Sequence, residues 1–282
     1  MASNPAFNRI EKDAKGGYAE FGGQPVSAAQ QSAAAQAATA GMTAQQLQEL
    51  YNQPSATPVD TRRVTMDDVI MKTLALFAIV LVTAAGGWAV AANNPAAGSA
   101  IWIGGMIGTL VIGLVIAFKK TLSVPLILLY ALVEGLFMGA VSQFFNVAYP
   151  GIVGQAVLAT LATFAGMFLA YKFGLIKVTA KFRRVMTMMI FGYAIFAVVN
   201  FIFAMITGSM FGFGDAGWLG IGISLFAVGL ASFTLALDFD SIEYAIRSGA
   251  PQPYSWLLAH GLIVTLVWLY IEFLRLFARL RS

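Results

Sequence analysis

Seven long apolar runs constrain the fold of this chain more than any other feature of its sequence. A helix that crosses the hydrocarbon core of a bilayer needs about 20 mostly apolar residues. The runs cover residues 70–92, 99–118, 122–145, 152–173, 186–207, 217–238 and 255–277. Only 11% of the residues are charged, whereas soluble domains carry about 25%. We therefore predict an all-α polytopic membrane protein, built as a bundle of seven transmembrane helices.

The charges between the runs predict how the chain crosses the membrane. Lysines and arginines gather before the first run and in the second and fourth connections, whereas the first, third and fifth connections have none. By the positive-inside rule, the N-terminus and the even-numbered connections are cytoplasmic. Arg275, Arg279 and Arg281 end the chain on the opposite side if the last run crosses fully. Because that run is long enough to span, we favour seven crossings over a re-entrant hairpin.

Residues 1–64 differ in composition from the rest of the chain. They are polar, rich in Ala and Gln, and lack the apolar core of a secretory signal. We predict a disordered or weakly helical cytoplasmic tail here and a seven-helix membrane domain over 65–282. Thr65 with Asp68 three residues later predicts a capping box at the start of the first span.

The composition also argues against several classes of function. The chain has no cysteine and a single histidine, His260, so disulfides, thiolate metal sites and histidine clusters are excluded. No P-loop, HExxH or GxSxG motif occurs, and we expect neither an enzyme nor a cofactor. The net charge of +4 comes from residues at the ends of the runs, which fits membrane orientation and not nucleic-acid binding.

Acidic residues inside or beside the apolar runs are the candidate functional groups. A carboxylate in mid-bilayer costs several kcal/mol unless it is paired, hydrated or protonated. Glu134 lies near the middle of the third run, among the small residues Ala131, Gly135 and Gly139, which permit close helix packing. It either faces a polar path or forms a structural hydrogen bond to a neighbouring helix.

The other acids belong to the last two runs. Asp238 and Asp240 point about 200° apart on a helix, so Asp238 faces the core while Asp240 and Glu243 are more exposed. Glu272 either pairs with Arg275 three residues later or meets Asp238 across two packed helices. Two carboxylates in contact share a proton. Such a pair would change charge near neutral pH, gate a cation path and offer oxygen ligands to Ca²⁺.

Two segments of the sequence carry a resemblance to a known family. LALDFDSIE at 235–243 and LVWLYIEFLRLF at 266–277 resemble the last two helices of the Bax inhibitor-1 family, also called the transmembrane Bax-inhibitor-motif family. Asp238 with Ile242 matches the end of span six, and Glu272 stands where span seven usually has Asp. The connection between these acids is also longer than in short bacterial members. The resemblance covers about 65–280, leaves the tail outside, and is closest in type to the actinobacterial branch.

The resemblance implies a bundle in which the last helix is central and surrounded by the other six. It implies a pH-sensitive calcium leak in the bacterial inner membrane, gated by Asp238 and Glu272, which would also hold Ca²⁺ transiently. Glu134, Asp240 and Arg275 would be supporting polar residues, and Asp240 with Glu243 a cytoplasmic rim that attracts cations. The expected partners are the lipid bilayer and calcium ions. The alternative is a non-conducting membrane protein that regulates a protease or another membrane partner through its tail and the basic connection at 172–185.

Overall fold

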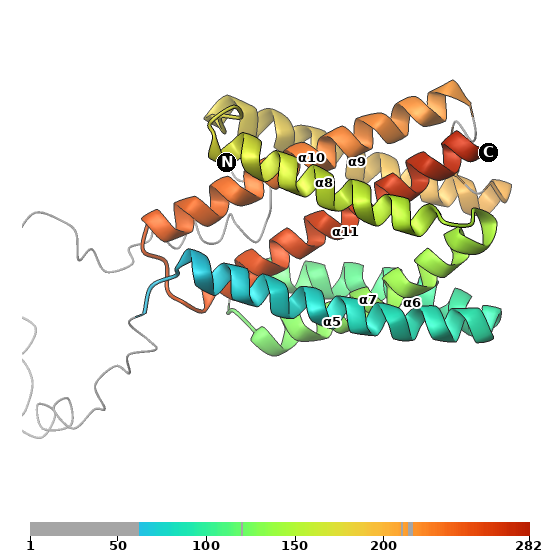
Figure 1. Ribbon diagram of the computed structural model, residues 1–282, viewed down its shortest axis with the longest axis horizontal. Helices are drawn as coiled ribbons and strands as arrows, with labels where there is room; N and C mark the ends of the chain where they lie inside the picture. Colours follow the sequence, from blue (N-terminus) through green and yellow to red (C-terminus); the bar gives the residue numbers. More distant parts are fainter. Residues whose placement is uncertain (1–61, 120, 210, 214–216) are drawn as a thin grey trace, which may run out of the picture.

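The described part of the chain folds into seven long helices and contains no strand. The computed structural model describes residues 62–282 except 120, 210 and 214–216, so the predicted tail lies almost wholly outside the described residues. The helices are α5 (Met66–Asn93), α6 (Pro95–Phe118), α7 (Val124–Ala148), α8 (Ile152–Lys172), α9 (Ala180–Thr207), α10 (Trp218–Arg247) and α11 (Tyr254–Arg281). All seven are long and apolar enough to cross a membrane. They run alternately up and down the bundle (Figure 1), which confirms the predicted fold class.

Local sequence signals explain several of the helix ends. The predicted capping box is present before α5, where the Thr65 side chain accepts from the Asp68 N–H and the Asp68 side chain accepts from the Thr65 N–H. Asn94 ends α5 and also caps α6, because its side chain accepts from the Ala97 N–H at 3.1 Å. Gly151 adopts φ 81° in the tight turn before α8, a conformation that favours glycine.

Helix α10 extends nine residues beyond the predicted end of the sixth run. The acidic stretch after Asp238 is helical as far as Arg247, so only 248–253 connects α10 to α11. The end of the apolar run did not predict these last turns because they contain charged residues. In the fold, Asp240 and Glu243 bind side chains of neighbouring helices, which stabilises the additional turns. The acids are therefore fixed on a helix and do not lie in a flexible turn.

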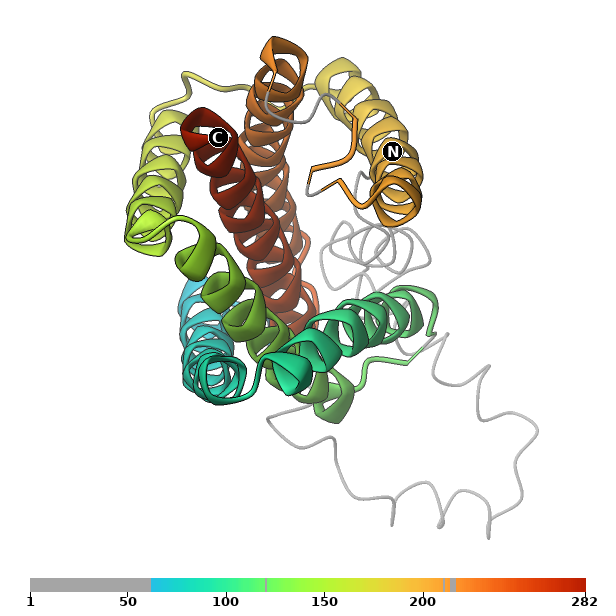
Figure 2. The ribbon, with the colours of Figure 1, turned by 90° about the vertical axis from the view of Figure 1, so that its right-hand side faces the viewer.

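Helix α11 occupies the centre of the bundle, as predicted (Figure 2). It is the most buried of the seven helices and packs against α5, α7, α8 and α10. Helix α6 packs on α5 and α7, while α9 lies at the periphery against α10. Among the described residues, α11 carries five buried polar or charged side chains, namely Ser255, His260, Thr265, Glu272 and Arg279.

Helices α5 and α7 approach unusually closely because α7 carries glycines at the contact. A Cβ atom on Gly135 would lie 1.8 Å from Thr83 Oγ1, and one on Gly139 would lie 2.0 Å from the carbonyl oxygen of Ala84. No side chain fits at either position without moving the helices apart. The close packing predicted from the small residues around Glu134 is therefore confirmed.

The residues just before α5 fasten that helix to the connection between α10 and α11. Val64 donates its N–H to the Ala250 carbonyl at 2.8 Å, and Gln252 donates its N–H to the Arg62 carbonyl at 2.8 Å. Val64 is only 2% exposed. Residues 62–64, assigned to the tail from the sequence, are thus part of the folded bundle.

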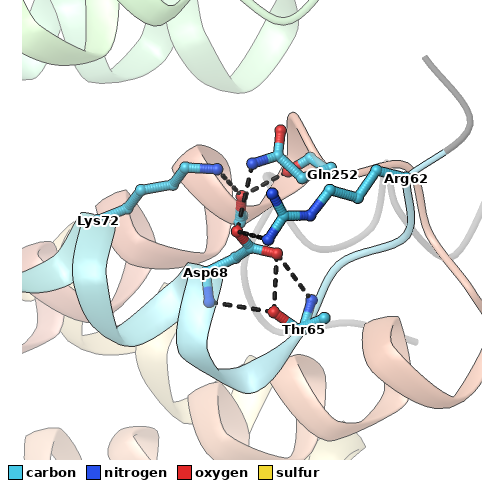
Figure 3. Close-up of polar contacts among 6 residues, drawn as sticks. Arg62, Thr65, Asp68, Lys72 and Gln252 are labelled. Carbon is cyan, nitrogen blue, oxygen red and sulfur yellow. Dashed lines mark hydrogen bonds and ion pairs between the residues drawn. The ribbon is translucent and has the colours of Figure 1, made fainter. Parts of the chain in front are cut away.

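Side chains complete this attachment (Figure 3). Asp68 accepts hydrogen bonds from Thr65 Oγ1 at 2.7 Å, Arg62 Nη2 at 3.2 Å and Gln252 Nε2 at 3.3 Å. Lys72 donates to the hydroxyl of Ser255 at the start of α11. We call this group the N-terminal clamp. It closes the end of the bundle at which α5, α7, α9 and α11 begin, which we call the N-terminal end.

Candidate functional site

Asp238 is a buried carboxyl group with no hydrogen-bond partner among the described residues. It projects from α10 and is 1% exposed, and neither of its oxygens is hydrogen-bonded. Thr265 of α11 lies beside it, but the Thr265 hydroxyl donates to the Gly261 carbonyl at 3.2 Å. An ionised carboxylate left without a partner in such surroundings costs several kcal/mol. Asp238 is therefore a buried acid whose described surroundings offer no stabilising partner to a negative charge.

Glu272 is equally buried but is well supplied with partners. It is 3% exposed, and its Oε1 accepts hydrogen bonds from the Tyr193 hydroxyl of α9 and from Trp268 Nε1 at 3.1 Å. Arg275 Nη1 lies 3.5 Å from the same oxygen. The helical ion pair considered from the sequence is confirmed, and three neighbouring groups donate to or pair with the Glu272 carboxylate.

The predicted hydrogen-bonded pair of Asp238 and Glu272 is not formed. Thr265, which lies beside Asp238, and Glu272 are seven residues apart on α11, and this separation is two helical turns or about 10.5 Å. Tyr193 and Arg275 hold the Glu272 carboxylate in its own pocket. The two acids are therefore separate groups along one pair of helices, and a shared proton is excluded in this conformation.

Asp240 and Glu243 bind side chains of neighbouring helices. Asp240 makes an ion pair with Arg183 of α9. Glu243 accepts a hydrogen bond from Tyr171 of α8 at 2.5 Å, and Arg247 lies 3.7 Å away. The cation-attracting rim stays a prediction, since each carboxylate has a protein partner but the Glu243 side chain is 45% exposed.

Glu134 occupies a different polar pocket. It is 4% exposed on α7, and its polar neighbours are Tyr130 on the same helix and Thr109 on α6. The Tyr130 ring meets the ring of His260 edge-on, with centroids 4.4 Å apart. His260 of α11 is thus in contact with α7, and it lies twelve residues, or about 18 Å along the helix, from Glu272. Glu134 has different polar neighbours from Asp238 and Glu272.

The described residues contain no group of three or more histidine, aspartate or glutamate side chains arranged to hold a metal ion. Calcium sites use six to eight oxygen ligands. Because Asp238 and Glu272 are apart, a resident calcium site built on both is not formed.

The C-terminal arginines are the functional candidates that the sequence left unresolved. Arg279 is 2% exposed and donates to Ser224 Oγ at 2.8 Å and to the Phe211 carbonyl at 3.2 Å. Arg281 donates to Gln155 Oε1 at 2.7 Å. With Arg275 bound to Glu272, all three arginines have protein partners, although Arg281 is exposed. The unbroken helix α11 also excludes the re-entrant hairpin.

Fold and site together define an all-α, multi-pass membrane protein whose central helix pair carries buried acids. A family model described as Bax inhibitor 1 like matches residues 4–282. The chain belongs to the Bax inhibitor-1-like family. The match includes nearly all of the N-terminal segment that the sequence resemblance left outside. A comparison with curated proteins found no match.

Proposed function

We propose that this protein is a pH-sensitive leak for calcium or a similar cation in the bacterial inner membrane, with its N-terminus in the cytoplasm. The observation that carries the proposal is Asp238, a fully buried carboxyl group inside a membrane bundle that has no hydrogen-bond partner in the described part of the chain. Intramembrane acids of this kind mark ion and proton pathways. Carboxylate oxygens are also the ligands that Ca²⁺ prefers.

The two acids of the central helices act separately in this proposal. Neutral Asp238 is compatible with the closed bundle, whereas ionised Asp238 favours any conformation that brings water or a cation to it. Glu272 lies about 10.5 Å further along α11 and provides a second carboxylate. A cation reaches it only if Arg275 or Tyr193 gives way. The pH dependence therefore belongs to Asp238 alone.

The orientation rests on the charges at the two ends of the bundle. Exposed lysines lie at the N-terminal end, where Lys119 follows α6 and Lys177 lies in the connection before α9. The arginines at the opposite end are engaged by protein groups. Free positive charge therefore gathers at the end that the positive-inside rule assigns to the cytoplasm.

Calcium flux into liposomes that contain the purified full-length protein tests the proposal. Flux is measured from about pH 6 to about pH 8, a range that buried carboxyl groups can titrate in. Wild type is expected to conduct in a pH-dependent manner, and Asp238→Asn to show low flux at every pH, because its amide stays neutral. Glu272→Gln is expected to lower the flux but keep its pH dependence. Glu134→Gln shows whether the third buried acid, expected from the sequence to be a supporting polar residue, contributes to the flux.

Two results would refute this function. Wild-type flux no greater than that of empty liposomes at any pH excludes a leak. Unchanged pH dependence in Asp238→Asn excludes Asp238 as the titrating group. Loss of pH dependence in both Asp238→Asn and Glu272→Gln would instead support the hypothesis that the two acids titrate as a coupled pair.

A non-conducting protein that regulates a membrane partner is the second candidate. It is supported by the connection between α8 and α9, where Phe173 and Leu175 are 72% and 80% exposed and lie close in sequence to Lys172 and Lys177. An apolar and basic connection of this kind suits a partner at the membrane surface. Absence of flux, together with a partner captured by wild type but not by Phe173→Ser, would favour this function.

A further inference from the structure

The connection between α8 and α9 carries positive charges that are not matched by acids of the bundle. Four exposed cationic side chains occur between the last residue of α8 and the second turn of α9, namely Lys172, Lys177, Lys181 and Arg184. None of the four forms an ion pair with another described residue. We call these four residues the cationic cluster. It lies at the N-terminal end of the bundle (Figure 1).

The acids that α10 brings to this end are bound by other groups. Asp240 pairs with Arg183 of α9, and its side chain is only 15% exposed. Glu243 accepts a hydrogen bond from the Tyr171 hydroxyl at 2.5 Å and lies 3.7 Å from Arg247 Nη1. Each carboxylate therefore has an arginine of its own. The charges of the cationic cluster remain available to an anion from outside the protein.

Two large apolar side chains are exposed beside these charges. Phe173 and Leu175 are 72% and 80% exposed, and an ordered turn presents them. Gly174 between them adopts φ 71°, a conformation that favours glycine. Leu175 donates its N–H to the Ala170 carbonyl at 2.9 Å. The end of α8 is thus a built turn that presents apolar and cationic groups together.

We propose that the cationic cluster, together with Phe173 and Leu175, binds acidic phospholipids of the leaflet at the N-terminal end. The cationic side chains bind the anionic headgroup, and the two apolar side chains contact the acyl chains. Clusters of about four or more lysines and arginines beside a spanning helix attract acidic phospholipids. The inference concerns lipid binding alone and holds whether or not the protein conducts ions.

A lipid fits this surface better than a protein partner does. Residues 173–179 alone separate α8 from α9, whereas a stable protein interface uses about 20–30 residues on each side. Because the connection joins two helices that are long enough to span the bilayer, it lies at the depth of the lipid headgroups. Four like charges beside two apolar side chains match a molecule that has an anionic headgroup and apolar chains.

Quenching in vesicles tests the proposal at its location. The chain contains no cysteine, so Ala180→Cys places a single fluorophore at the exposed first residue of α9. The full-length protein is reconstituted into phosphatidylcholine vesicles with a minor fraction of phosphatidylglycerol, and one lipid or the other carries a nitroxide quencher. The relative association of phosphatidylglycerol is expected to exceed that of phosphatidylcholine about tenfold or more, because each nearby cation contributes about fivefold.

Further variants identify the groups that bind the lipid. Lys177→Gln combined with Lys181→Gln is expected to reduce the preference for phosphatidylglycerol about tenfold or more. Both side chains are exposed, so the Tm of this variant should stay near that of wild type. Phe173→Ser keeps every charge and is expected to weaken the association of both lipids without changing their ratio. Arg281→Gln, which removes an exposed cation from the opposite end, is the matched control and should keep the preference.

A second fluorophore position tests the location. Ala96→Cys places the label on an exposed residue at the start of α6, at the opposite end of the bundle, and little preference is expected there. Equal association of the two lipids at Ala180→Cys would overturn the lipid site. A preference that persists in the Lys177→Gln, Lys181→Gln variant, or is as large at Ala96→Cys, would overturn its assignment to the cationic cluster. Equal association, together with a protein partner that Phe173→Ser loses, would make the connection a protein-docking surface instead.

Discussion

Replacing Gly139 with alanine tests the packing that holds the first and third spans together. The added Cβ atom would lie 2.0 Å from the carbonyl oxygen of Ala84 and 2.6 Å from the backbone nitrogen of Trp88. Optimal contacts between non-bonded carbon atoms are about 3.5–4.0 Å, so α5 and α7 must separate by about 1.5 Å to restore an ordinary contact. Both obstructing atoms belong to the backbone, and no change of rotamer relieves them.

The expected cost follows from this geometry. Overpacking a core costs about 1–3 kcal/mol when side chains can adjust, and a backbone obstruction places Gly139→Ala near the upper limit. About 2–3 kcal/mol corresponds to a fall in Tm of about 5–10 °C for a domain of this size. The variant is therefore expected to melt well below wild type while keeping its helical content.

Gly166→Ala is the matched control for the same substitution. Gly166 lies within α8, and a Cβ atom there meets nothing within 4 Å. Alanine in place of a helical glycine stabilises by about 0.5–1 kcal/mol, so the Tm of this variant should rise slightly. The Tm of each variant is measured in detergent, with the loss of monodisperse protein on heating as the readout. Equal melting temperatures for Gly139→Ala and Gly166→Ala would refute the close approach of α5 and α7.

Further variants test three other contacts. Tyr270→Phe or Ser142→Ala breaks a buried 2.7 Å hydrogen bond between α11 and α7. Each variant is expected to lose about 1–2 kcal/mol of unfolding free energy. Additive losses in the double variant would contradict a direct interaction between the two side chains. Arg183→Gln leaves Asp240 without its ion-pair partner and is expected to cost about 1–2 kcal/mol, part of which Asp240→Asn should restore. Asp68→Asn weakens the N-terminal clamp, so amide exchange just before α5 should accelerate; unchanged exchange would mean that the backbone contacts suffice.

The membrane class, the number of spans and several helix ends could be predicted from the sequence because each depends on local chemistry. An apolar run of sufficient length partitions into a bilayer wherever its neighbours lie. The capping box at Thr65 and the small residues around Glu134 act within one or two turns of helix. Asp238 was likewise predicted to face the core, because it stands at the end of an apolar run.

The partners of the charged residues were decided by tertiary structure alone. The acids of α10 and α11 bind residues of other helices: Asp240 binds Arg183, Glu243 binds Tyr171 and Glu272 binds Tyr193. Asp238 has no such partner among the described residues. Such contacts depend on the rotation and depth of each helix, which are set by packing against its neighbours.

Arg279 shows this division most clearly. In the sequence it is one of three basic residues at the end of the chain, and the positive-inside rule counts it only as a charge. Its seven-residue spacing from Glu272 predicts the face of α11 on which it lies, but not its burial. Only the fold brings Ser224 and the Phe211 carbonyl within 3.2 Å of its guanidinium. A periodic pattern sets where a side chain points along its own helix, whereas the free energy of burying its charge depends on what the other helices place there.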